Sequence, residues 1–148
     1  MPSQIEQMFP DLWVDEESEE GKNLNEAPLI QTQIDRFRKK YTFSYNKVHD
    51  SQYGEKLLAT IPSLTRNQLN VIVLNFVDML SHARTESKMI RELAQSEAAY
   101  RSLTKSWFQH SSTLELFKRI AERGGKVIVT TDHGTIRVTN PIKVIGDE

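Results

Sequence analysis

A nearly continuous apolar run at residues 69–77 restricts the fold of this chain more than any other feature. Only Asn70 and Asn75 interrupt the run, so apolar side chains fall on both faces of the strand that it predicts. A strand that is apolar on both faces suits a parallel sheet covered by helices, because both of its faces are then buried. The run therefore predicts an α/β fold, and it puts Asp78 directly at the end of this strand.

Apolar residues at helical spacing surround this strand in the sequence. Helices are predicted at residues 26–40 and 55–61, and the second ends at Pro62 because proline disrupts a helix interior. Three helical patterns follow the strand, and the third begins with a capping-box sequence at residues 112–115 and closes at the glycines of residues 124–125. The apolar positions of these patterns are Met89, Ile90 and Leu93, then Tyr100, Leu103 and Trp107, then Leu114, Phe117, Ile120 and Ala121.

Further strands are predicted on both sides of the apolar run. Residues 41–45 alternate aromatic and hydroxyl side chains, and residues 127–130 are β-branched throughout. The succession of strand 69–77, helices and strand 127–130 has the form of a crossover unit of a mostly parallel sheet with flanking helices. Residues 136–138 and 142–144 predict a small hairpin near the end of the chain.

Two short patterns of metal-ligand side chains stand at the predicted ends of the two strands of this unit. Asp78 and His82 are spaced four apart, while Asp132 and His133 are adjacent and precede Gly134. Functional sites of doubly wound sheets lie beyond the carboxyl ends of the strands. Carboxylate oxygen and imidazole nitrogen together suit zinc or manganese. We therefore expect a metal site at this edge of the sheet.

Two ligands in each pattern are too few for a good site, because a catalytic zinc usually has three protein ligands. Either the two patterns share one ion, which would then be a closed structural site, or each pattern binds its own ion with ligands from elsewhere. A generic α/β domain with accidental ligands is the alternative, since Asp132 can instead cap its own loop. Arg84 either faces a phosphate oxygen or lies on the surface of the following helix.

The charge balance and the absence of cysteine limit the partners and the compartment. The net charge is −1, so no global basic field holds a polyanion, although a nucleic acid remains acceptable as a substrate. The chain contains no cysteine, which favours a reducing compartment, and we expect the cytoplasm. The first residues have neither the basic nor the apolar region of a signal peptide, and no stretch predicts a membrane span.

Five segments of the chain are informative together, namely NFVDMLSHART at residues 75–85, YRS at 100–102, SWF at 106–108, TTDHGT at 130–135 and FPDLW at 9–13. They closely resemble the PglZ domain of the alkaline phosphatase superfamily, with PorX-type bacterial response regulators as the nearest look-alikes. This resemblance implies a partial alkaline-phosphatase-like fold with a two-metal phosphoryl-transfer site, usually of zinc, and a threonine or serine nucleophile. It assigns Asp78 and His82 to one ion, and Asp132 and His133 to the other.

The chain departs from the family pattern at two points. No residue matches the nucleophile, because Thr130, Thr131 and Thr135 only flank the second ligand pair, and no histidine follows His133. We therefore expect residues 1–148 to be an internal fragment of a single PglZ domain that is inactive in isolation. The parent would hydrolyse a phosphomonoester or phosphodiester, such as a nucleotide or oligonucleotide, and carry a receiver domain. The alternative is a regulatory or binding module of a signalling protein with a structural or vestigial metal site.

Overall fold

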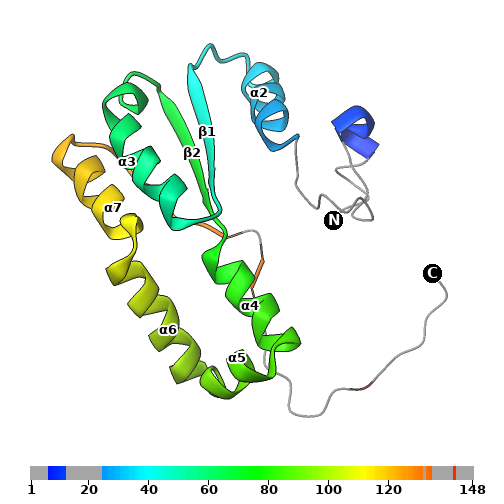
Figure 1. Cartoon of the computed structure of the whole chain (residues 1–148). Helices are drawn as coiled ribbons and strands as arrows, with labels where there is room; N and C mark the ends of the chain where they lie inside the picture. Colours follow the sequence, from blue (N-terminus) through cyan, green and yellow to red (C-terminus); the bar gives the residue numbers. More distant parts are fainter. Residues whose placement is uncertain (1–6, 13–24, 132, 135–141, 143–148) are drawn as a thin grey trace.

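A computed structural model of the chain describes residues 7–12, 25–131, 133, 134 and 142. These residues form a mixed α/β structure in which helices flank two parallel strands (Figure 1), so the predicted fold class is confirmed. No helix among them is long and apolar enough to cross a membrane. In chain order the elements are η1 (Pro10–Leu12), α2 (Glu26–Arg36), β1 (Phe43–Val48), α3 (Ser51–Leu64), β2 (Leu69–Leu74), α4 (Phe76–Glu86), α5 (Lys88–Leu93), α6 (Glu97–His110) and α7 (Ser112–Glu122).

The two strands pair in parallel, in a register that sets Phe43 opposite Leu69 and Val48 opposite Leu74. Helix α3 connects them, so the described crossover unit is β1–α3–β2. The prediction that residues 127–130 supply the second strand of such a unit is wrong. These residues follow α7 without strand structure, and the side chain of Ile128 is 91% exposed. Strand propensity alone forms no ladder, because a strand needs a hydrogen-bonded neighbour.

The core lies between α3, α7 and one face of the sheet. Leu57, Leu58 and Ile61 of α3 form a buried cluster with Leu116 of α7. Val48 and Ile72 pack against this cluster from the sheet. Burial of each such aliphatic side chain contributes about 1.5–3 kcal/mol, so this layer fixes the sheet relative to α3 and α7.

Helix α3 continues through Pro62, which the sequence predicts to end it. Proline has no N–H group, so the carbonyl of Leu58, four residues earlier, lacks its usual partner in the helix. The guanidinium of Arg119 in α7 replaces that partner, with Nη1 donating to the Leu58 carbonyl oxygen at 3.4 Å. A cation from a neighbouring helix thus satisfies the group that the proline leaves unpaired.

The ends of α2 and α7 share one hydrogen-bonding arrangement. After α7, the N–H groups of Gly124 and Gly125 donate to the carbonyls of Ala121 and Ile120, and Gly124 has a φ of +67°. This is a Schellman motif with glycine in the left-handed position, as the sequence predicts. Helix α2 ends in the same way with Arg38 at a φ of 51°, so it stops at Arg36 instead of residue 40.

Two predicted boundaries on either side of the sheet also differ. Strand β2 ends at Leu74 instead of residue 77, because its partner β1 ends at Val48, whose carbonyl accepts the last bond from Asn75. Helix α4 then begins at Phe76. The cap of α7 is Ser111, whose hydroxyl accepts from the N–H of Thr113, so the cap precedes the predicted capping box by one residue. The predicted hairpin lies outside the described residues except for Ile142, which is exposed and not in a strand.

Candidate metal centre

Helix α4 carries Asp78 and His82 on one face just beyond the carboxyl end of β2. Asp78 lies in the first turn of the helix, where the helix dipole favours a negative charge. His82 follows one turn later, which brings its Nε2 atom to 3.5 Å from Asp78 Oδ1. The sequence predicts these residues at the end of a strand, whereas the structure places both on a helix. There, a spacing of four residues brings the two side chains to the same face.

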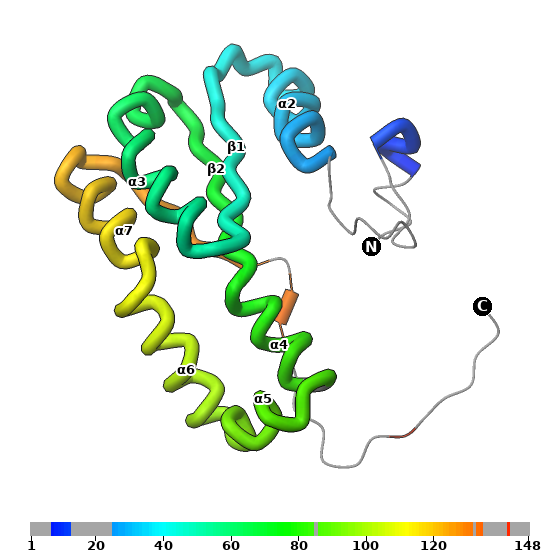
Figure 2. The backbone as a smooth tube through the Cα atoms, viewed as in Figure 1, coloured from blue at the N-terminus to red at the C-terminus, as the bar shows by residue number. Residues whose placement is uncertain are grey.

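The segment after α7 returns to this point and delivers His133. Figure 2 shows the orange part of the chain passing from the end of α7 back toward the start of α4. There the Nε2 atom of His133 lies 3.8 Å from Asp78 Oδ1. The Thr131 hydroxyl donates to the carbonyl oxygen of His133 at 2.8 Å, which joins these two residues. Asp132, the fourth predicted ligand, lies outside the described residues.

The distances around Asp78 can be compared with those of a metal site. Ligand atoms about 2.0–2.2 Å from a tetrahedral zinc lie roughly 3.3–3.5 Å from one another. The 3.5 Å between Asp78 Oδ1 and His82 Nε2 has this value, whereas the 3.8 Å from Asp78 Oδ1 to His133 Nε2 is longer than the spacing of two ligands on one such ion. Among the described residues, no group of three or more histidine, cysteine, aspartate or glutamate side chains could hold a metal ion, so Asp78, His82 and His133 do not form a complete site by themselves. Carboxylate oxygen and imidazole nitrogen are nevertheless donor types that zinc accepts.

The three side chains are open to solvent, with exposed fractions of 53% for Asp78, 69% for His82 and 59% for His133. Exposed ion pairs stabilise a fold very little, because water screens them. Stability therefore gives little reason for these three groups to lie together. Their exposure also leaves the donor atoms accessible to an ion or to a phosphate group.

Arg84 contacts two residues of α6. Its Nη1 atom lies 3.2 Å from Glu97 Oε1, and its guanidinium carbon lies 5.5 Å from the centre of the Tyr100 ring. Arg84 is thus half-buried and connects α4 to α6, and its approach to a phosphate oxygen stays a prediction. Sequence reasoning missed Glu97 and Tyr100 as neighbours of the site, since only the packing of α6 beside α4 brings them there.

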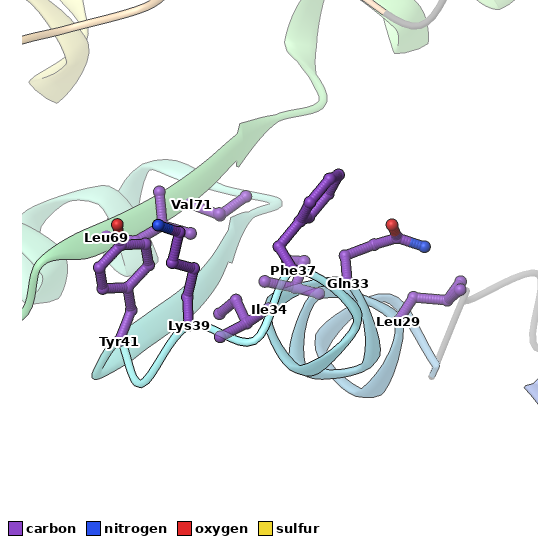
Figure 3. Close-up of a pocket in the computed structure, with 9 residues that line it drawn as sticks. Leu29, Gln33, Ile34, Phe37, Lys39, Tyr41, Leu69 and Val71 are labelled. Carbon is purple, nitrogen blue, oxygen red and sulfur yellow. The ribbon is translucent and has the colours of Figure 1, made fainter.

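An apolar groove of about 510 Å³ lies at the other end of the sheet, between α2 and the strands. Figure 3 shows Ile34 of α2 and Phe37, the residue that follows this helix, on one side, and Leu69 and Val71 of β2 on the other. Leu69 is the first residue of β2, whereas Asp78 follows the end of that strand. The groove is therefore separate from the candidate metal centre and provides no ligand-type carboxylate or imidazole to it.

The chain matches the model of a known protein family. The family model described as the BREX system PglZ alkaline phosphatase-like domain matches residues 1–148. No curated protein matches the chain. The matched range includes both predicted ligand pairs and the helices that lie between them.

Proposed function

The chain belongs to the PglZ family of alkaline phosphatase-like domains, and we propose that it forms part of a metal-dependent phosphoric ester hydrolase. The observation that carries this proposal is the approach of His82 and His133 to one carboxylate oxygen of Asp78, at 3.5 and 3.8 Å. A carboxylate and two imidazoles from separate segments of the chain are the donor types of hydrolytic metal sites.

In this proposal each ligand pair holds one divalent ion. Asp78 and His82 bind the first ion, and His133 binds the second together with Asp132. Zinc is the proposed metal, with manganese as the alternative, because both accept the oxygen and nitrogen donors present. Bound divalent ions neutralise charge on a phosphoryl group and lower the pKa of an attacking hydroxyl or water.

The protein groups contribute position and charge. Helix α4 holds its two ligands one turn apart, and a hydrogen bond joins Thr131 to the His133 carbonyl in the second segment. The nucleophile and the remaining ligands come from other parts of the protein in this proposal. The substrate is a phosphomonoester or phosphodiester, such as a nucleotide or oligonucleotide, because the proposed site recognises the phosphoryl group itself.

A hydrolysis assay on the intact zinc-loaded protein tests this function. We expect the protein to hydrolyse p-nitrophenyl phosphate or bis-p-nitrophenyl phosphate. His82→Gln should lower the rate of hydrolysis by roughly 100-fold or more, as is typical when a group that stabilises transition-state charge is removed. His49→Gln is the matched control, because His49 is also exposed and follows β1 outside the cluster. Equal activity of the two variants would contradict the proposal.

A regulatory role is the second candidate, and the high exposure of the three side chains favours it, since hydrolytic sites are usually enclosed. In this version the domain belongs to a cytoplasmic response regulator of the PorX type and acts by binding. The motif around residues 75–85 supports that relationship, and the absence of cysteine suits the compartment. Unchanged signalling by an Asp78→Asn variant that has lost its metal would favour this role over hydrolysis.

A further inference from the structure

We propose that Tyr100 is a positioning residue that fixes the backbone at Asp78 and thereby sets the geometry of the metal centre, an inference that rests on the proposed function. Tyr100 lies in α6, which runs beside α4 in Figure 1. Its hydroxyl donates to the carbonyl oxygen of Val77 at 3.0 Å. The Val77 carbonyl and the Asp78 nitrogen belong to one planar peptide unit, so this bond restrains the backbone that carries the ligand.

The Tyr100 ring is itself held in place from α4. The guanidinium carbon of Arg84 lies 5.5 Å from the ring centre, in the range of a cation–π contact. Glu97, one turn before Tyr100 in α6, holds that guanidinium through an ion pair of 3.2 Å. Glu97, Arg84 and Tyr100 therefore form a chain of contacts that ends at the peptide unit preceding Asp78.

A second contact from α6 braces the same turn of α4. The rings of Phe76 and Trp107 stack with their centres 4.5 Å apart and their planes 1° apart. Phe76 is the first residue of α4, and Val77 follows it. The first turn of the helix is thus attached to α6 by a ring stack and a hydrogen bond on the two residues before Asp78.

The metal centre needs these contacts from α6 because its ligands are exposed. Asp78 and His82 are more than half exposed, so packing of their own side chains does little to hold them. A metal site requires its ligands within about 0.5 Å of the productive arrangement. Outer contacts that orient ligands typically change metal affinity by about 10–100-fold when they are removed. We expect removal of the Tyr100 hydroxyl to weaken metal affinity by an amount at the lower end of this range, because the hydroxyl acts on the ligand only through the backbone.

A Tyr100→Phe variant of the intact protein tests the inference, because it removes the hydroxyl and keeps the ring beside Arg84. Two quantities are measured: the zinc dissociation constant by competition with a chromophoric chelator, and amide hydrogen exchange at residues 79–82 without metal. We expect a dissociation constant raised by roughly tenfold and faster exchange at these residues. Tyr41→Phe is the matched control, since Tyr41 lines the apolar groove, and it should change neither quantity.

The outcomes separate positioning from a general structural role. Weaker zinc binding with a thermal midpoint matching that of Tyr41→Phe supports the inference. Unchanged exchange, or faster exchange with unchanged zinc affinity, overturns it. A wild-type protein that binds no zinc overturns the inference together with the proposed function, and that failure is visible before any variant is compared.

Discussion

The Nε2 atom of His133 lies 3.8 Å from Asp78 Oδ1, although Asp78 follows β2 and His133 follows α7. This contact brings together one residue from each of the two ligand pairs, which are far apart in the sequence. Paired metal ions in phosphoryl-transfer sites are about 3.5–4 Å apart, so ligands of the two ions must themselves lie close together. The contact is therefore what a two-ion centre requires of these two side chains.

The number of ions bound distinguishes two separate sites from one shared site. We expect the intact protein to bind two zinc ions, and Asp78→Asn and His133→Gln each to lose one of them, because each substitution removes a ligand of a different ion. Elemental analysis after removal of free metal measures this. Loss of all zinc in either single variant would mean that the pairs share one ion. The control is His110→Gln, which changes an exposed histidine at the end of α6.

Arg119 should stabilise the protein through the carbonyl that Pro62 leaves unpaired. We expect Arg119→Ala to lower the free energy of unfolding by about 1–2 kcal/mol, the cost of an unsatisfied carbonyl. In a Pro62→Ala background, the N–H group of residue 62 can bond to the Leu58 carbonyl within the helix. Arg119→Ala should then lower the free energy of unfolding by only about 0.5 kcal/mol, the contribution of the exposed ion pair between Arg119 and Glu115. Urea denaturation of the four proteins in this cycle measures the difference. Equal costs in both backgrounds would show that the bond to Leu58 contributes nothing.

Gly54 allows α3 to approach the start of α7 closely. A Cβ atom at this position would collide with the hydroxyl oxygen of Ser112 and lie 3.2 Å from its Cβ. Gly54→Ala should therefore destabilise the protein by about 1–2 kcal/mol, despite the gain of about 1 kcal/mol in helix propensity. The same change in a Ser112→Gly background should stabilise it. Thermal denaturation decides the matter, and stabilisation in both backgrounds would contradict the close approach.

Arg38 occupies a left-handed position where glycine is favoured. A non-glycine residue in this conformation costs about 1–2 kcal/mol, so Arg38→Gly should raise the free energy of unfolding by about 1 kcal/mol. The neighbouring Lys39→Gly serves as control and should give no gain, because Arg38 alone among these two has a positive φ. A loss of stability in Arg38→Gly, measured by urea denaturation, would contradict the assignment of the α2 end.

The fold class follows from the sequence, because hydrophobic periodicity is a local property. Helix α4 does not, since the sequence predicts a strand end at Asp78 and its helical patterns begin only at Met89. The apolar run predicts a parallel sheet with helices, and β2 begins at Leu69 as expected. Its early end could not be predicted, since the length of the partner strand decides it. Likewise, no residue near Pro62 in the sequence predicts the hydrogen bond from Arg119 to the Leu58 carbonyl. The end of α2 at Arg38 could not be predicted either, because no glycine is present there.

The candidate site divides in the same way. The residue types and the spacing identify Asp78, His82 and His133 as ligand candidates, and Asp132 stays a prediction because it lies outside the described residues. The contacts from α6 to the first turn of α4 could not be predicted from the sequence, since its pattern assigns Tyr100 and Trp107 to the core face of an amphipathic helix. Only the side-by-side packing of α4 and α6 gives them a second role.

The most direct measurement is anomalous X-ray diffraction at the zinc absorption edge from crystals of the intact protein grown with zinc. The account predicts an anomalous peak about 2.0–2.2 Å from Asp78 Oδ1 and His82 Nε2, and a second peak beside His133. An Asp78→Asn crystal should lose the first peak. Peaks confined to other histidines, or none near Asp78, would contradict the assignment of this cluster as a metal centre.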